Sequence, residues 1–215
     1  MAIIQNPVIG RARKQAGGMV FSKMYDKNVM RAKPAQVTPS NTPKQQVQRL
    51  FIALLTQFIK ALSPDNLITL YPFKPAQRSR YSEFQHQLAA GRKVTDTTSE
   101  VDFEEIPFIG NGPTNDMTEL TFDTSVANIA VEWNVDDTNS IFSPDSLMSL
   151  LAFNKNTKES VFIANFATYG DGGQIVPYPS GWTNAHSIEV YVMGKTVKFK
   201  PGSELSSNCK RAAAV

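Results

Sequence analysis

The sequence predicts an α+β protein, in which an N-terminal β-hairpin and two helices precede an immunoglobulin-like antiparallel β-sandwich. Three observations support this fold class. Residues 43–62 carry apolar side chains at every third or fourth position, as an amphipathic helix does. Residues 113–202 instead contain short strand-like runs separated by turn residues. The charge also divides, because fifteen Lys and Arg outnumber three acids in residues 1–93, whereas sixteen acids outnumber seven Lys and Arg in residues 94–215.

The hairpin is predicted near the start of the chain. Residues 18–25 and 28–33 have strand composition, and the stretch Tyr25 to Asn28 has the residue types of a turn. A two-stranded hairpin is only marginally stable in water on its own. We therefore expect it to pack on something else, for example on a neighbouring subunit. Residues 34–39 are expected to form an extended linker.

The first helix is predicted over residues 43–62. Thr42 is a suitable N-cap, Pro43 occupies the first helical position, and Gln45 completes a capping box. A wide apolar stripe follows, for which a place in the core is favoured over a partner-binding face; it comprises Val47, Leu50, Phe51, Leu54, Leu55, Phe58, Ile59 and Leu62. The pair Ser63-Pro64 is expected to end the helix.

The second helix is predicted from Pro75 to about Ala90, with Gly91 as its C-cap. Its buried side is expected to contain Tyr81, Phe84 and Leu88. The predicted strands follow at 120–123, 129–133, 147–153, 160–166, 174–177, 188–193 and 196–200, with turns at 136–139, 154–157, 170–173 and 194–195.

These elements suggest four segments. Residues 1–93 would be a basic hairpin-plus-helix assembly module with a net charge of +12, and 94–112 an acidic linker. Residues 113–202 would form the β-sandwich domain, and 203–215 a flexible tail. The divided charge has three interpretations: contact with nucleic acid, contact with the oppositely charged half of a neighbouring copy, or simple solvation of the surface.

No residue is predicted to be catalytic, to bind a cofactor or to ligate a metal. The two histidines, His86 and His186, lack the spacing of a metal site, and Gly170 to Gly173 is not followed by the Gly-Lys-Ser/Thr of a phosphate-binding loop. Cys209, the single cysteine, cannot form an internal disulfide, which leaves a bridge between two chains as a minor alternative. The start of the chain lacks the features of a signal peptide, and the apolar runs are too short to span a bilayer.

Several motifs resemble an uncharacterised family of proteins of Bacteroidota and of their phages. In the N-terminal part the matching residues are Gly10, Gly17-Gly18, Arg31-Ala-Lys-Pro34 and Thr42-Pro-Lys-Gln45. In the β half they are Trp133, Asp145, Leu150 to Asn154, Pro179 to Gly181, Glu189 to Tyr191 and Ser203 to Ser207. This chain has fewer N-terminal glycines and a more acidic middle. The resemblance implies a bacteriophage virion structural protein and supplies no catalytic residues.

We therefore expect a non-enzymatic virion protein, assembled in the host bacterial cytoplasm, that forms homo-oligomers and contacts other phage proteins. A ring at the head–tail junction or in the tail is favoured over a capsid decoration. No membrane and no small-molecule substrate is expected. The alternatives are a DNA-associated packaging protein, with non-specific DNA contact, and a carbohydrate-binding β-sandwich that exposes Trp133 and Trp182. The residues expected at the interface are Arg11, Arg13, Lys14, Phe21, Tyr25, Arg31 and Lys33.

Overall fold

The computed structural model divides the chain into two compact units, Met1–Thr42 and Pro43–Val215. It describes residues 2–4, 14–16, 19–24, 27–32, 42–60, 62–73, 75–76, 78–95, 99–136, 141–196 and 205–215.

The first unit is a four-stranded antiparallel sheet in the order β1-β4-β3-β2. Its strands are β1 (Ala2–Ile4), β2 (Lys14–Ala16), β3 (Met19–Met24) and β4 (Lys27–Ala32). The predicted hairpin corresponds to β3 and β4, whose register pairs Met24 with Lys27. The flanking strands β1 and β2 were not predicted, because three residues are too few to show an alternating pattern.

The second unit begins with three helices. Helix α1 (Pro43–Lys60) is the first predicted helix, and most of its predicted stripe is buried. Leu50 is an exception at 60% exposed, and Ile52 on the opposite flank is 49% exposed. The apolar arc of α1 is therefore wider than the core that it covers.

Helix α2 (Pro64–Leu70) was not predicted from the sequence. The pair Ser63-Pro64 ends α1, as predicted, but it also starts α2. The Ser63 hydroxyl accepts a hydrogen bond from the Asn66 amide, and Pro64 is the first helical residue. Its seven residues are too short to establish a helical period.

Helix α3 (Arg80–Ala90) starts five residues later than predicted. Ser79 is its N-cap and accepts a hydrogen bond from the Ser82 amide at 3.1 Å, so the capping serine, and not Pro75, sets the start. Gly91 is the C-cap, as predicted, and a β-carbon there would lie 2.1 Å from the carbonyl oxygen of Asp102. The glycine thus allows the strands after α3 to pack closely.

The β-strands of the second unit form two main sheets. The large sheet has the order β11-β10-β13-β15-β7, with β14 beside β13, and the small sheet has the order β12-β9-β8-β16. The strands of the large sheet are β7 (Phe108–Ile109), β10 (Leu147–Asn154), β11 (Glu159–Thr168), β13 (Ile188–Thr196), β14 (Leu205–Ser206) and β15 (Cys209–Arg211). Those of the small sheet are β8 (Thr121–Asp123), β9 (Asn128–Glu132), β12 (Gly173–Pro177) and β16 (Ala213–Ala214).

The predicted α+β class and the β-sandwich are confirmed. Six predicted strands correspond to β8 through β13. The predicted turn at Gly194-Lys195 is wrong, because β13 continues to Thr196. Of the strand predicted at 196–200, Thr196 belongs to β13 and residues 197–200 lie outside the described residues.

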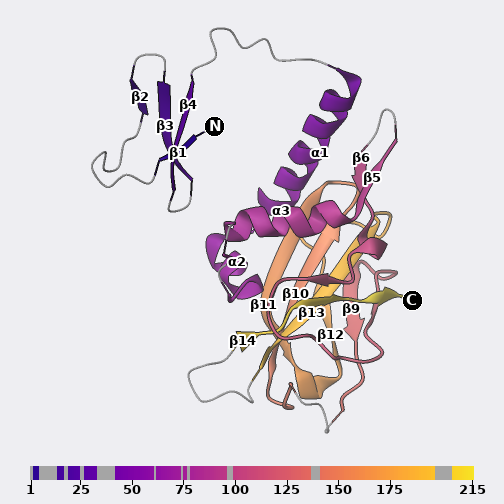
Figure 1. Ribbon diagram of the computed structural model, residues 1–215. Coiled ribbons are helices and arrows are strands. Elements are labelled where there is room, and N and C mark those ends of the chain that lie inside the picture. Colours follow the sequence, from indigo (N-terminus) through magenta and orange to yellow (C-terminus); the bar gives the residue numbers. More distant parts are fainter. Residues whose placement is uncertain are drawn as a thin grey trace. The chain divides into compact units, whose positions relative to one another are not determined.

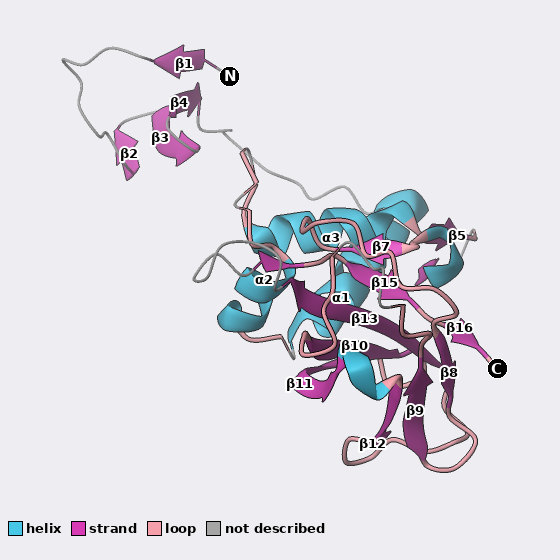
Figure 2. Ribbon diagram, turned by 90° about the horizontal axis from the view of Figure 1, so that it is seen from below, coloured by secondary structure: helices cyan, strands magenta, loops and turns pink. Residues whose placement is uncertain are grey.

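The second unit has three layers (Figures 1 and 2): helices, large sheet and small sheet. One core lies between the helices and the large sheet and contains Phe58, Phe84 and Phe153. The other lies between the two sheets and contains Val131, Leu150 and Val190. The large sheet is thus covered on both faces, which explains why seven of the eight residues of β10 are buried.

This layering corrects the predicted segments. The helices of the predicted 1–93 module pack on the sheet predicted for 113–202, so the compact units divide after Thr42 and not after residue 93. The predicted linker 94–112 contains structure: β5 (Arg92–Val94) pairs with β6 (Ser99–Val101), and a 3₁₀ turn η2 (Phe103–Glu105) and β7 follow.

The predicted flexible tail 203–215 is also wrong in its described part. Strand β15 lies between β13 and β7, and β16 pairs in parallel with β8. Cys209 is completely buried, and burial raises the pKa of its thiol. The alternative in which this cysteine bridges two folded chains is therefore contradicted.

Candidate interaction surfaces

Three of the predicted interface residues lie on described strands of the N-terminal sheet. Lys14 on β2 is opposite Phe21 on β3, whereas Arg31 on β4 is opposite Val20. Arg31 is exposed. The remaining predicted residues, Arg11, Arg13, Tyr25 and Lys33, lie outside the described residues.

The N-terminal sheet is cationic. The four strands together contain three lysines and one arginine but no acid. Among its described side chains, Val29 is buried, Val20 and Met30 are half-buried, and Met19 is 44% exposed.

The small sheet of the second unit has one covered face and one uncovered face. Ile129 and Val131 on β9 and Phe122 on β8 point into the core between the sheets. Residues that alternate with them point outward and form a surface that we name the acidic face; it comprises Thr121, Asp123, Ala130, Glu132, Gly173 and Ile175.

Strand register arranges the acidic face in rows. Glu132 lies between Thr121 and Gly173, and the next row places Ala130 between Asp123 and Ile175. Ile175 is 64% exposed, and Glu132 is exposed as well. The sequence did not predict this surface, because its strands come from three segments whose pairing no local pattern specifies.

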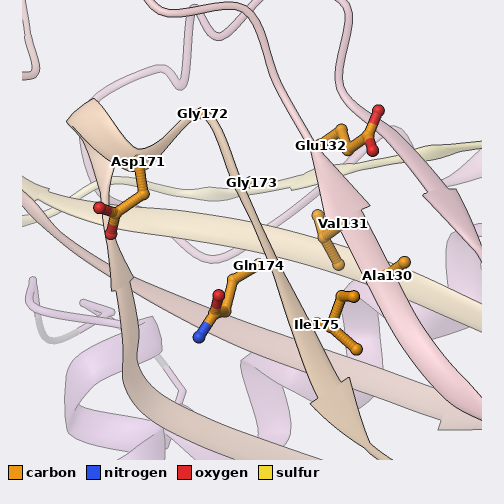
Figure 3. A pocket seen from close by; sticks show the side chains of 8 residues that line it. All are labelled: Ala130, Val131, Glu132, Asp171, Gly172, Gly173, Gln174 and Ile175. Atoms are coloured by element: carbon orange, nitrogen blue, oxygen red, sulfur yellow. The ribbon is translucent and has the colours of Figure 1, made fainter.

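Two adjacent open hollows lie at one end of this face, and they share Glu132 and Gly172. One has a volume of about 360 Å³ and is lined by β9, β12 and the turn before β12 (Figure 3). The other has a volume of about 400 Å³ and extends to Glu119 and Thr121. Gly173 is needed here, because a β-carbon would lie 2.8 Å from the carbonyl oxygen of Val131.

Two carboxylates near this face are held in their ionised form. Asp123 accepts hydrogen bonds from the Ser125 amide and hydroxyl, both at 2.8 Å, and these bonds lower its pKa. Asp171 in the turn η3 (Tyr169–Asp171) accepts from the amide and hydroxyl of Thr168, which lowers its pKa in the same way. These carboxylates remain charged at neutral pH.

The segments that contain β8, β9 and β12 are acidic. Residues 111–136 and 169–187 contain no lysine or arginine, and their acids are Asp116, Glu119, Asp123, Glu132, Asp136 and Asp171. The fourth strand of the small sheet, β16, follows Lys210 and Arg211. The face formed by β8, β9 and β12 therefore has a negative potential at neutral pH.

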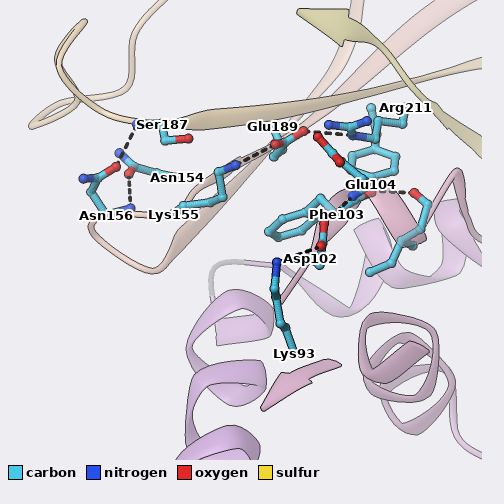
Figure 4. Close-up of polar contacts among 12 residues, drawn as sticks. Lys93, Asp102, Phe103, Glu104, Asn154, Lys155, Asn156, Ser187, Glu189 and Arg211 are labelled. Carbon is cyan, nitrogen blue, oxygen red and sulfur yellow. Dashed lines mark hydrogen bonds and ion pairs between the residues drawn. The ribbon is translucent and has the colours of Figure 1, made fainter. Parts of the chain in front are cut away.

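An ion-pair network around Glu189 holds segments of the second unit together (Figure 4). Glu189 on β13 is 6% exposed; its carboxylate oxygens contact Lys155 Nζ at 2.7 Å and Arg211 Nε at 2.9 Å. It thereby joins the turn after β10 to β15. Because both partners neutralise the carboxylate, this network ties three segments together.

Gln87 on α3 forms a second polar clamp, which no local sequence pattern indicates. Its side-chain oxygen accepts hydrogen bonds from the Tyr71 hydroxyl at 2.7 Å and from the Gly110 amide at 2.8 Å, and its amide donates to the Gly110 carbonyl at 3.1 Å. Burial raises the pKa of Tyr71 well above its usual range. The clamp fixes α3 against the end of β7.

The histidines have ordinary structural surroundings. His86 is exposed on α3. His186 accepts a hydrogen bond from the Thr183 amide at 3.3 Å and lies 2.9 Å from the buried side-chain amide of Asn154, so it orders the loop before β13. Among the described residues, no three His, Cys, Asp or Glu side chains are grouped closely enough to share a metal ion.

Both tryptophans are buried. Trp133 is 4% exposed and donates its indole N–H to the Tyr169 carbonyl at 2.8 Å. Trp182 is 7% exposed and donates to the carboxylate of Glu159 at 3.1 Å. A carbohydrate-binding sandwich was expected to expose these two rings, so that alternative loses the residues on which it depended.

Comparisons of the chain with protein-family models, curated proteins and solved structures found no match. Within the described residues, no helix is both long and apolar enough to cross a membrane.

Proposed function

We propose that this chain is a non-enzymatic structural protein of a bacteriophage particle, which oligomerises and contacts neighbouring proteins through its N-terminal sheet. The observation that carries the proposal is that the short strands β1–β4 belong to a separate compact unit, Met1–Thr42. A unit of about 40 residues is marginally stable by itself, so it gains stability when another surface covers it.

The charge distribution supports a contact between unlike surfaces. Residues 1–42 contain seven Lys and Arg and one acid, whereas residues 43–215 contain fifteen Lys and Arg and eighteen acids. A contact between two different surfaces of identical copies is heterologous, and such contacts close into a ring when the rotation between copies permits it. This favours a ring at the head–tail junction or in the tail over a capsid decoration.

The phage setting of the proposal depends on the family resemblance, and the motifs Arg31 to Pro34 and Thr42 to Gln45 are its most specific part. The assembly role depends on the residues themselves. The two parts can therefore fail independently, because an assembling protein need not belong to a virion.

The rival function is association with DNA, which the cations of β1–β4 favour. Phosphate binding by Lys and Arg is strongly salt-dependent and independent of sequence. Retention of the full chain on random duplex DNA at low salt, with release as salt rises, would support the rival, and absence of retention at low salt would exclude it.

The role of the N-terminal sheet is tested by comparing the full chain with a chain that begins at Pro43. Both hydrophobic cores lie entirely within residues 43–215, so the shortened chain retains the packing of the second unit. Light scattering on the eluting protein should give an oligomer for the full chain and a monomer for the shortened chain, with similar circular dichroism spectra in the β region. Normal assembly of the shortened chain would contradict the proposed role.

A further inference from the structure

We propose that the acidic face of the small sheet is the docking site for the sheet β1–β4 of a second copy of this chain. This inference rests on the proposed function and adds the identity of the receiving surface. It follows from the shape, the exposure and the charge of the two surfaces.

The acidic face has the shape of a surface on which another sheet can pack. Thr121, Ala130 and Gly173 on this face have small side chains or none, so a second sheet can approach closely around Glu132. Ile175 projects from the edge strand β12 and is 64% exposed, which leaves an apolar side chain without cover in the described structure. The two hollows beside Glu132 provide room for side chains of the incoming sheet.

The exposed side chains of the N-terminal sheet complement these features. Val20 on β3 is half-buried and lies opposite the exposed Arg31 on β4, so one face of the sheet offers an apolar side chain beside a cation. Lys27 and Arg31 on β4 supply cations, and no acid stands on any strand of this sheet.

Charge complementarity selects this occupant over an unrelated protein of neutral surface. The acidic face carries Asp123 and Glu132, with Glu119 and Asp171 at its hollows, and its segments contain no Lys or Arg. A cationic sheet is attracted to it and is held in one orientation, because complementary charges contribute orientation and association rate more than raw affinity.

The contact is heterologous, because the donated sheet and the receiving face are different surfaces. Each copy therefore donates one sheet and receives one, and a closed ring leaves neither surface unused.

Charge reversal in the full chain tests this inference. The acceptor variant Glu119→Lys/Glu132→Lys reverses two exposed carboxylates beside the hollows. The donor variant Lys27→Glu/Arg31→Glu reverses two cations of β4. The control Glu100→Lys/Glu105→Lys makes the same change of charge at two exposed carboxylates beside the helices. A circular dichroism spectrum that matches that of the unaltered chain verifies that each variant has folded.

The acceptor variant and the donor variant should each elute at the monomer mass, 23.8 kDa for the unaltered chain, while the control retains the oligomer. A mixture of the acceptor and donor variants should assemble again into oligomers in which the two variants alternate, because it pairs each reversed surface with an opposite charge. For the unaltered chain, the dissociation constant should rise at least tenfold between about 0.05 M and about 0.5 M salt, since screening weakens exposed charge pairs.

The outcomes separate this inference from the function on which it rests. If the unaltered chain is a monomer, both the assembly role and the docking site are wrong. If the unaltered chain is an oligomer and the acceptor variant assembles equally well, the docking site alone is wrong. If both variants dissociate but their mixture does not reassemble, the two surfaces do not meet, and the docking site is again overturned.

Discussion

Phe153 on β10 is the residue on which the helical layer and the large sheet converge. Its ring lies 5.0 Å from that of Phe103, 5.5 Å from that of Phe58 and 5.8 Å from that of Tyr191, measured between centroids. Aromatic rings at these separations stabilise a core beyond their burial alone. The neighbours of Phe153 on its strand divide between the two cores, with Leu151 on the helical side and Ala152 on the side of the small sheet.

Replacement of Phe153 by alanine should lower the free energy of unfolding by about 3–5 kcal/mol, because it opens a cavity among aromatic side chains. Leu50→Ala on α1 is the matched control; Leu50 is 60% exposed, so its loss should cost less than about 1 kcal/mol. Urea denaturation of both variants measures the difference. Similar costs at the two positions would contradict the assignment of the core.

Cys209 gives a chemical test of burial at a single residue. Its thiol is completely buried and its pKa is raised by burial, so the reactive thiolate is scarce in the folded protein. A thiol-specific reagent should therefore label the native chain slowly and the urea-unfolded chain at once. Rapid labelling of the native chain, or a disulfide-linked dimer, would show that β15 is not held in the sheet.

Asp171 provides the pH-dependent prediction. Hydrogen bonds from Thr168 lower its pKa below the usual value of 3.8, so the folded state binds this proton less readily than the unfolded state. Its stabilising effect is complete above the ordinary pKa and is lost as the pH falls through the lowered pKa. An NMR titration should place the midpoint of Asp171 below 3.8, and in Thr168→Val, where the hydroxyl donor is absent, the midpoint should move upward. An unshifted midpoint in the native chain would contradict these hydrogen bonds.

At the scale of elements, the sequence predicted the helices and strands with a clear hydrophobic period, and it did not predict most of the very short ones. Helix α1 and strands β9 to β13 were predictable, because each is long enough or apolar enough to show a pattern, and β8 was predictable together with Leu120, which extends its alternation. Helix α2 has a local cap at Ser63 but only seven residues, whereas strands β7, β15 and β16 have two or three residues and are defined by tertiary contacts. The continuous apolar run of β10 indicates burial on both faces, because a strand covered on one face alone would alternate apolar and polar residues.

The C-terminal strands should be essential to the second unit. Removal of residues 209–215 deletes β15 and β16 and takes Arg211 from the nearly buried Glu189. We expect a loss of several kcal/mol, on the order of that for breaking a buried ion pair, about 3–5 kcal/mol, or failure to fold. Removal of Val215 alone, which is 88% exposed, should leave the melting temperature nearly unchanged. A normal melting temperature after the larger deletion would contradict the structural role of β15 and β16 and would support the flexible tail that the sequence predicted.

At the scale of the whole molecule, the sequence predicted a divided charge but not its arrangement. The N-terminal sheet was predictable in part, because β3 and β4 have strand composition and the surrounding residues are basic. The acidic face was not predictable, because it depends on the pairing of β8, β9 and β12, which are separated by up to about forty residues of chain. We propose that electrostatic attraction between these two surfaces of identical copies leads this chain to assemble.

The native mass of the full chain in solution tests that claim most directly. Native mass spectrometry over a range of protein concentrations should give a single oligomer mass, at least twice the 23.8 kDa of one chain, because a closed set of heterologous contacts ends at one size. A mass of 23.8 kDa at every concentration would contradict the account.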